Sequence, residues 1–176
     1  YILQHCRDTL PPHYELIVEG RIIEFTKPDM ATFKFEQCVQ LLPNDFYSHF
    51  YYGLNLRTLR RNEEALKQLE RALEIGSPIN NASVLSFIGH LYGQMDNKLN
   101  VAYEYFNKSL EAYPRALSSI ISIATLKCFK EQKYDEAIEM LDKYKAMCPI
   151  DVLVHKGYVY WANSKQEQAI ECLETA

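Results

Sequence analysis

The chain has 176 residues, 48% of them apolar and 24% charged, which is an ordinary composition for a soluble protein with a substantial core. Its formal net charge is −4, with acidic and basic residues intermixed. This argues against nucleic acid or an anionic membrane as the main partner, because both favour a concentrated basic face. No apolar run approaches the ~20 residues that span a bilayer, so we expect no membrane insertion.

Prolines recur along the chain at near-constant intervals. Pro11, Pro43, Pro78, Pro114 and Pro149 are separated by 32, 35, 36 and 35 residues. A fixed period in this range indicates a repeat architecture. A stripe of residues at helical spacing precedes each proline, and a last one runs to the end of the chain. The stripes are Leu3 and Cys6; Ala31, Phe35 and Cys38; Ala65, Leu69 and Ala72; Ala102, Phe106 and Ser109; Ala137, Leu141 and Tyr144; Ala169, Leu173 and Ala176.

These intervals predict one repeat domain over residues 1–176. We expect a partial repeat at 1–11, followed by repeats at about 12–43, 44–78, 79–114, 115–149 and 150–176. The opening residues YILQHCRDTL contain no initiator Met and no signal-like apolar segment. Because the chain also begins and ends within a stripe, we interpret the sequence as a fragment of a longer chain.

Each repeat shows two helical patterns joined by a short polar break, as residues 44–78 illustrate. Asn44 and Asp45 can cap the first helix of this repeat by accepting hydrogen bonds from its free N–H groups. The break follows at RRN, and Asn62 is the expected cap of the second helix.

A small residue recurs in the middle of each first helix. Gly costs about 1 kcal/mol relative to Ala inside a helix, so its recurrence needs a packing reason. We expect Gly53 to face Ala65 across two closely packed helices. The equivalent positions in the other repeats are Gly20, within one residue, Gly89, Ala124 or Thr125, and Gly157.

This pattern resembles the tetratricopeptide repeat (TPR), in which W-x-x-L-G-x-x-Y is followed by A-x-x-x-F-x-x-A and then P over about 34 residues. The resemblance covers essentially the whole chain. The opening Trp is absent throughout, and His49 takes its place in one repeat, where we expect a packed, hydrogen-bonded histidine. The best-matching repeats contain Tyr52, Gly53, Leu56, Ala65, Leu69 and Ala72, and then Leu85, Ile88, Gly89, Tyr92, Ala102, Phe106 and Pro114.

The resemblance implies an all-α fold, a TPR α-solenoid of antiparallel helix pairs forming a right-handed superhelix. In this family the first helices line the concave side, where a peptide or partner helix binds. An exposed aromatic groove is typical of a protein-binding site. The candidate peptide-binding residues are Tyr47, Phe50, Leu54, Arg57, Ser83, Ser86, His90, Ser119, Ser122, Leu126, Phe129, Val154, Tyr158 and Trp161. The alternative is that some of them, Phe129 and Trp161 in particular, face a neighbouring helix.

Some members of this family grip a C-terminal carboxylate with Lys, Asn and Arg side chains from successive first helices. No such clamp of Lys and Asn can be assembled here, so we expect no binding of chaperone tails. The matching positions hold Phe50, Leu54, Ser86, His90, Ser122 and Leu126.

We expect no catalytic site, no metal and no cofactor. The five His residues include no i, i+4 pair and no H-E-x-x-H, and the glycines form no phosphate loop. The five cysteines, at positions 6, 38, 128, 148 and 172, include no C-x-x-C. We interpret them as small buried hydrophobes in a reducing compartment, the cytoplasm or nucleus, rather than as disulfide or metal ligands.

These observations favour a non-enzymatic adaptor or scaffold that binds a protein or peptide. By analogy, it would be a subunit of a multi-protein complex, such as the anaphase-promoting complex or a ciliary transport complex. The alternative is a regulatory or substrate-recruiting repeat domain of an enzyme whose catalytic part lies outside this sequence. A third hypothesis is a homo-oligomer formed by end-stacking, with Leu173 in the contact.

Overall fold

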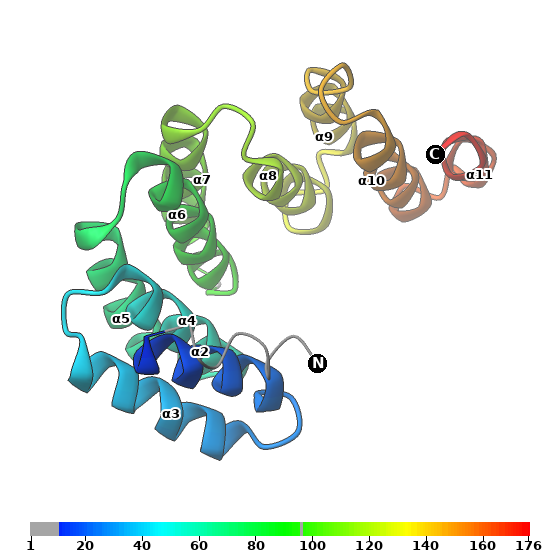
Figure 1. Cartoon of the computed structure of the whole chain (residues 1–176). Coiled ribbons are helices and arrows are strands. Elements are labelled where there is room, and N and C mark those ends of the chain that lie inside the picture. The colour runs from blue at the N-terminus through cyan, green and yellow to red at the C-terminus, as the bar shows by residue number, and fades with distance from the viewer. Residues whose placement is uncertain (1–10, 96) are drawn as a thin grey trace. The chain divides into compact units, whose positions relative to one another are not determined.

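The computed structural model describes residues 11–95 and 97–176, and within these ranges it contains ten helices and no strand (Figure 1). The predicted all-α fold is therefore confirmed. The partial repeat expected at 1–11 lies almost entirely outside the described residues. The chain divides into two compact units, Tyr1–Leu91 and Tyr92–Ala176, with the division near the end of one helix.

Helix pairs build the first unit. Its helices are α2 (Pro12–Ile23), α3 (Pro28–Leu41), α4 (Phe46–Thr58), α5 (Asn62–Ile75) and most of α6 (Pro78–Gly93). Short loops connect α2 to α3 and α4 to α5, and each of these pairs packs side by side. Contacts between α3 and α4 and between α2 and α4 join the two pairs.

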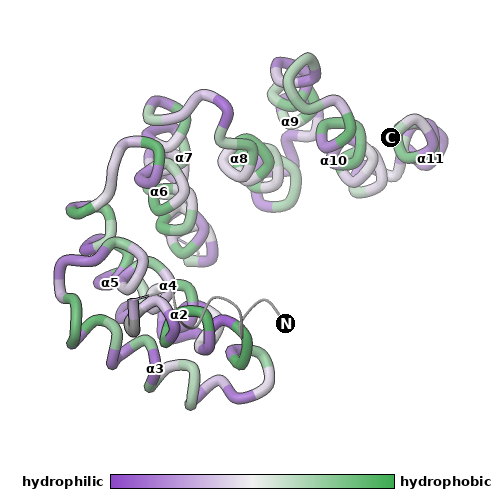
Figure 2. The backbone as a smooth tube through the Cα atoms, viewed as in Figure 1, coloured by the Kyte–Doolittle hydropathy of each residue, from purple (hydrophilic) through white to green (hydrophobic). Residues whose placement is uncertain are grey.

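The second unit has the same organisation. Its helices are α7 (Leu99–Ala112), α8 (Leu117–Phe129), α9 (Tyr134–Asp142), α10 (Pro149–Ala162) and α11 (Gln166–Thr175). Here α8 pairs with α9 and α10 with α11, while α7 packs against α8. Hydrophobic and hydrophilic residues are interspersed along the helices (Figure 2), so each helix can bury one side while the other faces water.

Of the two helix N-caps predicted from the sequence in residues 44–78, the structure confirms the one at α4 and contradicts the one at α5. Asp45 is the N-cap of α4, and its carboxylate accepts hydrogen bonds from the Ser48 N–H at 2.8 Å and the Ser48 hydroxyl at 2.7 Å. The predicted cap at Asn62 is wrong: Asn62 is the first residue of α5, and Arg61 precedes it without a capping side chain. Arg60 has a φ of 59°, which is a left-handed backbone conformation. It lies in the turn between α4 and α5, and α5 begins two residues later at Asn62.

Close helix approach at Gly53 is confirmed. A β-carbon at this position would lie 2.8 Å from Cγ of Leu69 and 3.3 Å from the carbonyl oxygen of Ala65. The same relationship recurs at Gly157, where a β-carbon would lie 2.9 Å from Cγ of Leu173. Real β-carbons essentially never come within 3.0 Å of another heavy atom, so any larger residue at these positions would displace the leucine side chain.

The structure also locates the small residues predicted in the middle of α2 and α8. A β-carbon on Gly20 would lie 2.8 Å from the ring of Phe35. Gly20 therefore allows close approach of α2 and α3, as Gly53 does for α4 and α5. In α8, Ala124 is buried and Thr125 is exposed. Ala124 is therefore the inward-facing small residue of that repeat.

Buried polar side chains help to fix the first unit. His49 is buried as predicted, with Nδ1 2.8 Å from Oε1 of Gln68 and Nε2 3.0 Å from the Pro43 carbonyl oxygen. Both ring nitrogens of His49 therefore lie within hydrogen-bonding distance of an oxygen atom. Between α3 and α4, the Thr32 hydroxyl lies 2.8 Å from the Asn55 side-chain oxygen.

The described cysteines divide into two classes. Cys38 and Cys128 are buried, as the sequence predicts, whereas Cys148 and Cys172 are partly exposed. All four are free thiols.

Candidate functional site

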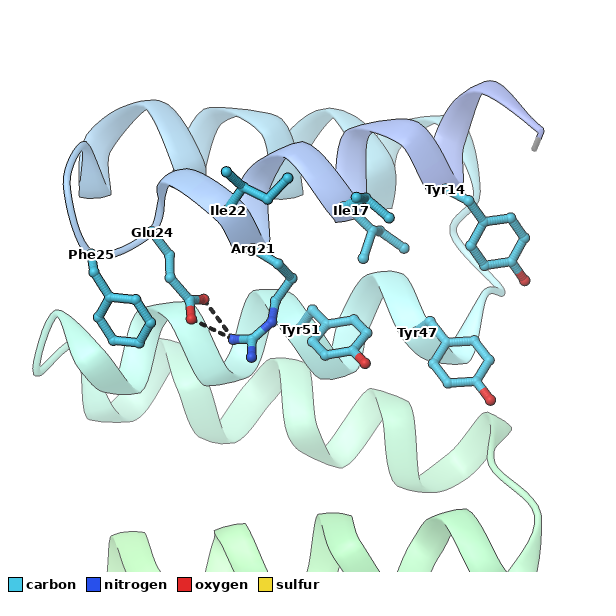
Figure 3. Close-up of a pocket in the computed structure, with 9 residues that line it drawn as sticks. Tyr14, Ile17, Arg21, Ile22, Glu24, Phe25, Tyr47 and Tyr51 are labelled. Atoms are coloured by element: carbon cyan, nitrogen blue, oxygen red, sulfur yellow. Dashed lines mark hydrogen bonds and ion pairs between the residues drawn. The ribbon is translucent and has the colours of Figure 1, made fainter. Parts of the chain in front are cut away.

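A cavity of about 470 Å³ lies between α2 and α4 in the first unit. We call it the first-unit cavity. Figure 3 shows Ile17, Arg21 and Tyr51 lying between the ribbons of the two helices, with Tyr14 and Tyr47 toward one end and Phe25 at the other. Its lining residues are Tyr14, Ile17, Val18, Arg21, Ile22, Glu24, Phe25, Tyr47 and Tyr51. Side chains of this kind offer a mainly apolar surface on the first helices of two successive repeats.

The charged residues of this cavity are paired with each other. Arg21 donates through Nη1 to both carboxylate oxygens of Glu24, at 2.5 and 2.7 Å. Its guanidinium carbon also lies 5.3 Å from the ring centroid of Tyr51. Glu24 is only 4% exposed, so this pairing compensates a carboxylate that would otherwise be costly to bury.

An aromatic cluster continues from α4 onto the part of α6 that belongs to the first unit. The ring of Phe50 stacks on Phe46 at 5.5 Å and lies 5.7 Å from Phe87. Arg57 also contacts the cluster, with its guanidinium carbon 4.8 Å from the Phe87 centroid. The His90 ring lies 6.4 Å from Phe87. We call Phe46, Phe50, Arg57, Phe87 and His90 the α4–α6 cluster.

The α4–α6 cluster carries one positive charge at neutral pH. Burial lowers the pKa of His90 below its ordinary value of 6.5, and the positive charge of Arg57 lowers it further. The imidazole is therefore neutral at pH 7. Burial also lowers the pKa of Arg57, but an arginine remains protonated at this pH.

The second unit has its own cavity, of about 330 Å³, between α8 and α10. We call it the second-unit cavity. Phe129, Tyr158 and Trp161 are 61%, 55% and 65% exposed, so neither the Phe nor the Trp is a core residue. The lining residues are Ile121, Ala124, Thr125, Phe129, Leu141, His155, Tyr158, Val159, Trp161 and Ala162.

The fourteen candidate residues separate into several groups. Tyr47 lines the first-unit cavity, and Phe50, Arg57 and His90 belong to the α4–α6 cluster. Phe129, Tyr158 and Trp161 line the second-unit cavity. Leu54 and Val154 are partly buried, Ser83 is exposed, and none of the three lines either cavity.

Four candidates face the interior instead of a groove. Ser86, Ser119 and Ser122 are buried, so the expected hydroxyl-rich lining is wrong at these positions. The Ser119 hydroxyl donates to that of Ser109 at 2.7 Å between α8 and α7, which satisfies both groups away from water. Leu126 packs against the core residues around Phe106.

Several lining residues were not among the candidates. Every residue that α2 contributes was missed because no candidate was taken before residue 47. Tyr51 was also missed, although its i, i+4 spacing from Tyr47 places both side chains on one helix face. Phe87, a member of the α4–α6 cluster, was also missed, and the candidate Ser86 next to it is buried.

Within residues 11–95 and 97–176, no three His, Cys, Asp or Glu side chains are grouped so that they could hold a metal ion. None of the helices described there is both long enough and apolar enough to cross a bilayer.

Paired helices, glycines at their contacts and cavities between successive first helices define an α-helical repeat protein. Residues 150–176 match the family model described as tetratricopeptide repeat. No curated protein sequence matches the chain at a significant level.

Solved structures share the fold over most of the chain. A thermophilic TPR protein of Thermus thermophilus is 14% identical, with 91% of this chain and 87% of that chain covered at a TM-score of 0.74. A tetratricopeptide repeat protein from Parabacteroides merdae is 20% identical, with 98% and 69% covered and a TM-score of 0.75. YrrB, a TPR protein with an unusual peptide-binding site, is 16% identical, with 97% and 88% covered and a TM-score of 0.60.

The resemblance to the tetratricopeptide repeat is therefore confirmed, by the family match in the last repeat and by the fold. TPR folds serve in general as protein-binding modules rather than as enzymes.

Proposed function

We propose that this chain is a non-enzymatic interaction module that binds a peptide segment of a partner protein in the first-unit cavity. The observation that carries the proposal is the cavity itself, an opening of about 470 Å³ walled by apolar and aromatic side chains from α2 and α4. Concave, mostly apolar sites with a few polar groups are typical of ligand-binding surfaces. Tyr is also common among the residues that dominate binding energy at interfaces.

The tyrosines of the cavity suit this role because the protein already holds them in place. Tyr47 lies in edge contact with Tyr14 at 6.4 Å and with Phe46 at 5.1 Å, and Tyr51 lies under the guanidinium of Arg21. Little side-chain entropy is therefore lost when a ligand packs against them. A partner side chain that fills the cavity would be apolar or aromatic.

Membership of a larger complex, of the anaphase-promoting or ciliary transport type, is a further part of the proposal and rests on analogy. The regulatory domain of an enzyme is its alternative. Both predict the same peptide-binding surface, so the surface is tested first.

A peptide array tests the proposal directly. The chain is applied to an array of short degenerate peptides with one fixed apolar residue, and binding is compared with that of the double variant Tyr47→Ser, Tyr51→Ser. We expect the variant to lose binding by at least about tenfold, since interface tyrosines often contribute more than 1 kcal/mol each. The matched control is Phe33→Ser, which removes an aromatic side chain that is 60% exposed on α3 outside the cavity.

The control should bind as well as the unmodified chain. If the double variant binds normally while Phe33→Ser does not, the binding surface is on α3 and the proposed site is wrong. Circular dichroism of each variant shows whether the helices are retained.

A further inference from the structure

Arg57 differs from Arg21, Arg61 and Arg71 in having no acidic partner among the described residues. Among the residues that the structure describes, no carboxylate forms a hydrogen bond or ion pair with it. Three other arginines each pair with a glutamate three residues later: Arg21 with Glu24, Arg61 with Glu64 and Arg71 with Glu74. Arg57 is nevertheless partly buried, so its guanidinium has given up water without gaining an anion from the described part of the chain.

The contacts of Arg57 compensate this loss only in part. A cation over an aromatic ring is stabilised only modestly at a partly exposed site, and the ring here is that of Phe87. The last turn of α4 favours a positive charge through the helix dipole, but it does so without requiring contact with the ring. A charge-assisted hydrogen bond to a carboxylate would be worth more than either effect.

The surroundings of Arg57 fit an anion next to apolar groups. His90 is neutral at pH 7, so it neither competes for the anion nor adds a second positive charge. The ring of Phe87 excludes water on one face of the guanidinium, which strengthens an ion pair formed there. One cation among aromatic rings suits a single carboxylate rather than a strongly charged segment.

We propose that the partner peptide carries an Asp or Glu side chain that pairs with Arg57 while a neighbouring apolar side chain fills the first-unit cavity. This inference rests on the proposed function and specifies the chemistry of its ligand. It differs from the gripping of a C-terminal carboxylate by several cations, because the anion is one side chain within the peptide.

The arrangement of helices sets the spacing of the two ligand groups. The cavity lies between α2 and α4, whereas Arg57 meets Phe87 between α4 and α6. Neighbouring helices pack about 8–10 Å apart, and an extended chain advances about 3.3 Å per residue. The acidic residue should therefore be about three residues from the apolar one.

The test uses acetylated, amidated peptides with a fixed Phe and, about three residues away, a fixed Asp, Glu, Asn, Gln, Lys or phosphoserine. The unmodified chain should bind the acidic peptides about tenfold more tightly than the amide isosteres, as expected when a hydrogen bond to a charged group is lost. Arg57→Gln should abolish this preference while retaining binding to the fixed Phe. Arg57→Lys should restore part of it. Arg115→Gln, an exposed change of equal charge in the second unit, should leave it intact.

The outcomes separate this inference from the proposed function. Binding with no acidic preference, or with a preference that survives Arg57→Gln, overturns the inference and leaves the cavity as the binding site. Tighter binding of phosphoserine than of Asp overturns the choice of a carboxylate. Binding of none of the peptides overturns the proposed function and this inference together.

Discussion

Gly53 packs so closely on Leu69 that a β-carbon at position 53 would lie 2.8 Å from Cγ of the leucine. Overpacking of this kind costs about 1–3 kcal/mol, whereas Ala gains about 1 kcal/mol over Gly in a helix. We therefore expect Gly53→Ala to lower the free energy of unfolding, as measured by urea denaturation. The matched control is Gly93→Ala, whose β-carbon would lie 3.4 Å from Leu126 in ordinary contact. If both variants are equally stable, the close approach at Gly53 is wrong.

Asp45 should stabilise α4 through its capping hydrogen bonds to Ser48. Replacing an N-cap Asp by Ala typically costs about 0.5–2 kcal/mol. We expect Asp45→Ala to lower the urea midpoint accordingly. Asp45→Asn retains a capping oxygen and should cost much less. An equal loss in both variants would show that the charge, rather than the hydrogen bonding, matters.

Gln132 has a φ of 57°, a left-handed conformation in which a side chain is strained by about 1–2 kcal/mol. Gly adopts this conformation without strain, but it also adds about 0.4–1 kcal/mol of unfolded-state entropy. We expect Gln132→Gly to raise stability by up to about 1 kcal/mol in thermal or urea unfolding. Gln132→Ala keeps the β-carbon and should give no gain. A destabilised Gly variant would contradict the backbone assignment.

The thiols should differ in reactivity with a disulfide reagent. Burial raises the pKa of Cys38 to about 11, so at pH 8 it is a protonated, inaccessible thiol, and Cys128 is likewise buried. Since only the thiolate reacts, Cys148 and Cys172 should be modified first in the native chain. The measurement is peptide mapping after timed labelling in a Cys6→Ser background. Early labelling of Cys38 would contradict its burial.

Trp161, the sole tryptophan, provides an optical probe of the second-unit cavity. Because it is 65% exposed, its fluorescence in the native chain should be quenched by acrylamide almost as strongly as in urea. A peptide that binds only in the first-unit cavity should leave this emission unchanged. Strong protection from quenching in the free chain would contradict the exposed position.

The repeats could be predicted from the sequence because their determinants are local. Gly53, Ala65 and Leu69 are fixed within one helix pair by spacing alone, and the same spacing recurs at Gly157, Ala169 and Leu173. The candidate site was harder to predict. A helix turns by about 100° per residue, so an error of one residue exchanges a groove position for a core position. This explains why Ser86 was chosen and Phe87 was missed.

The amino-acid sequence by itself determined the all-α repeat fold, the pairing of helices and the need for small residues where they touch. These features follow from periodicities within about 35 residues, over which helix geometry relates position to direction. Only the tertiary structure decided that α2 contributes to the cavity with α4, and that the guanidinium of Arg57 lies on the ring of Phe87. Such relationships join residues about 30 positions apart, and they depend on the rotation of each helix within its unit, which packing sets and local spacing leaves free.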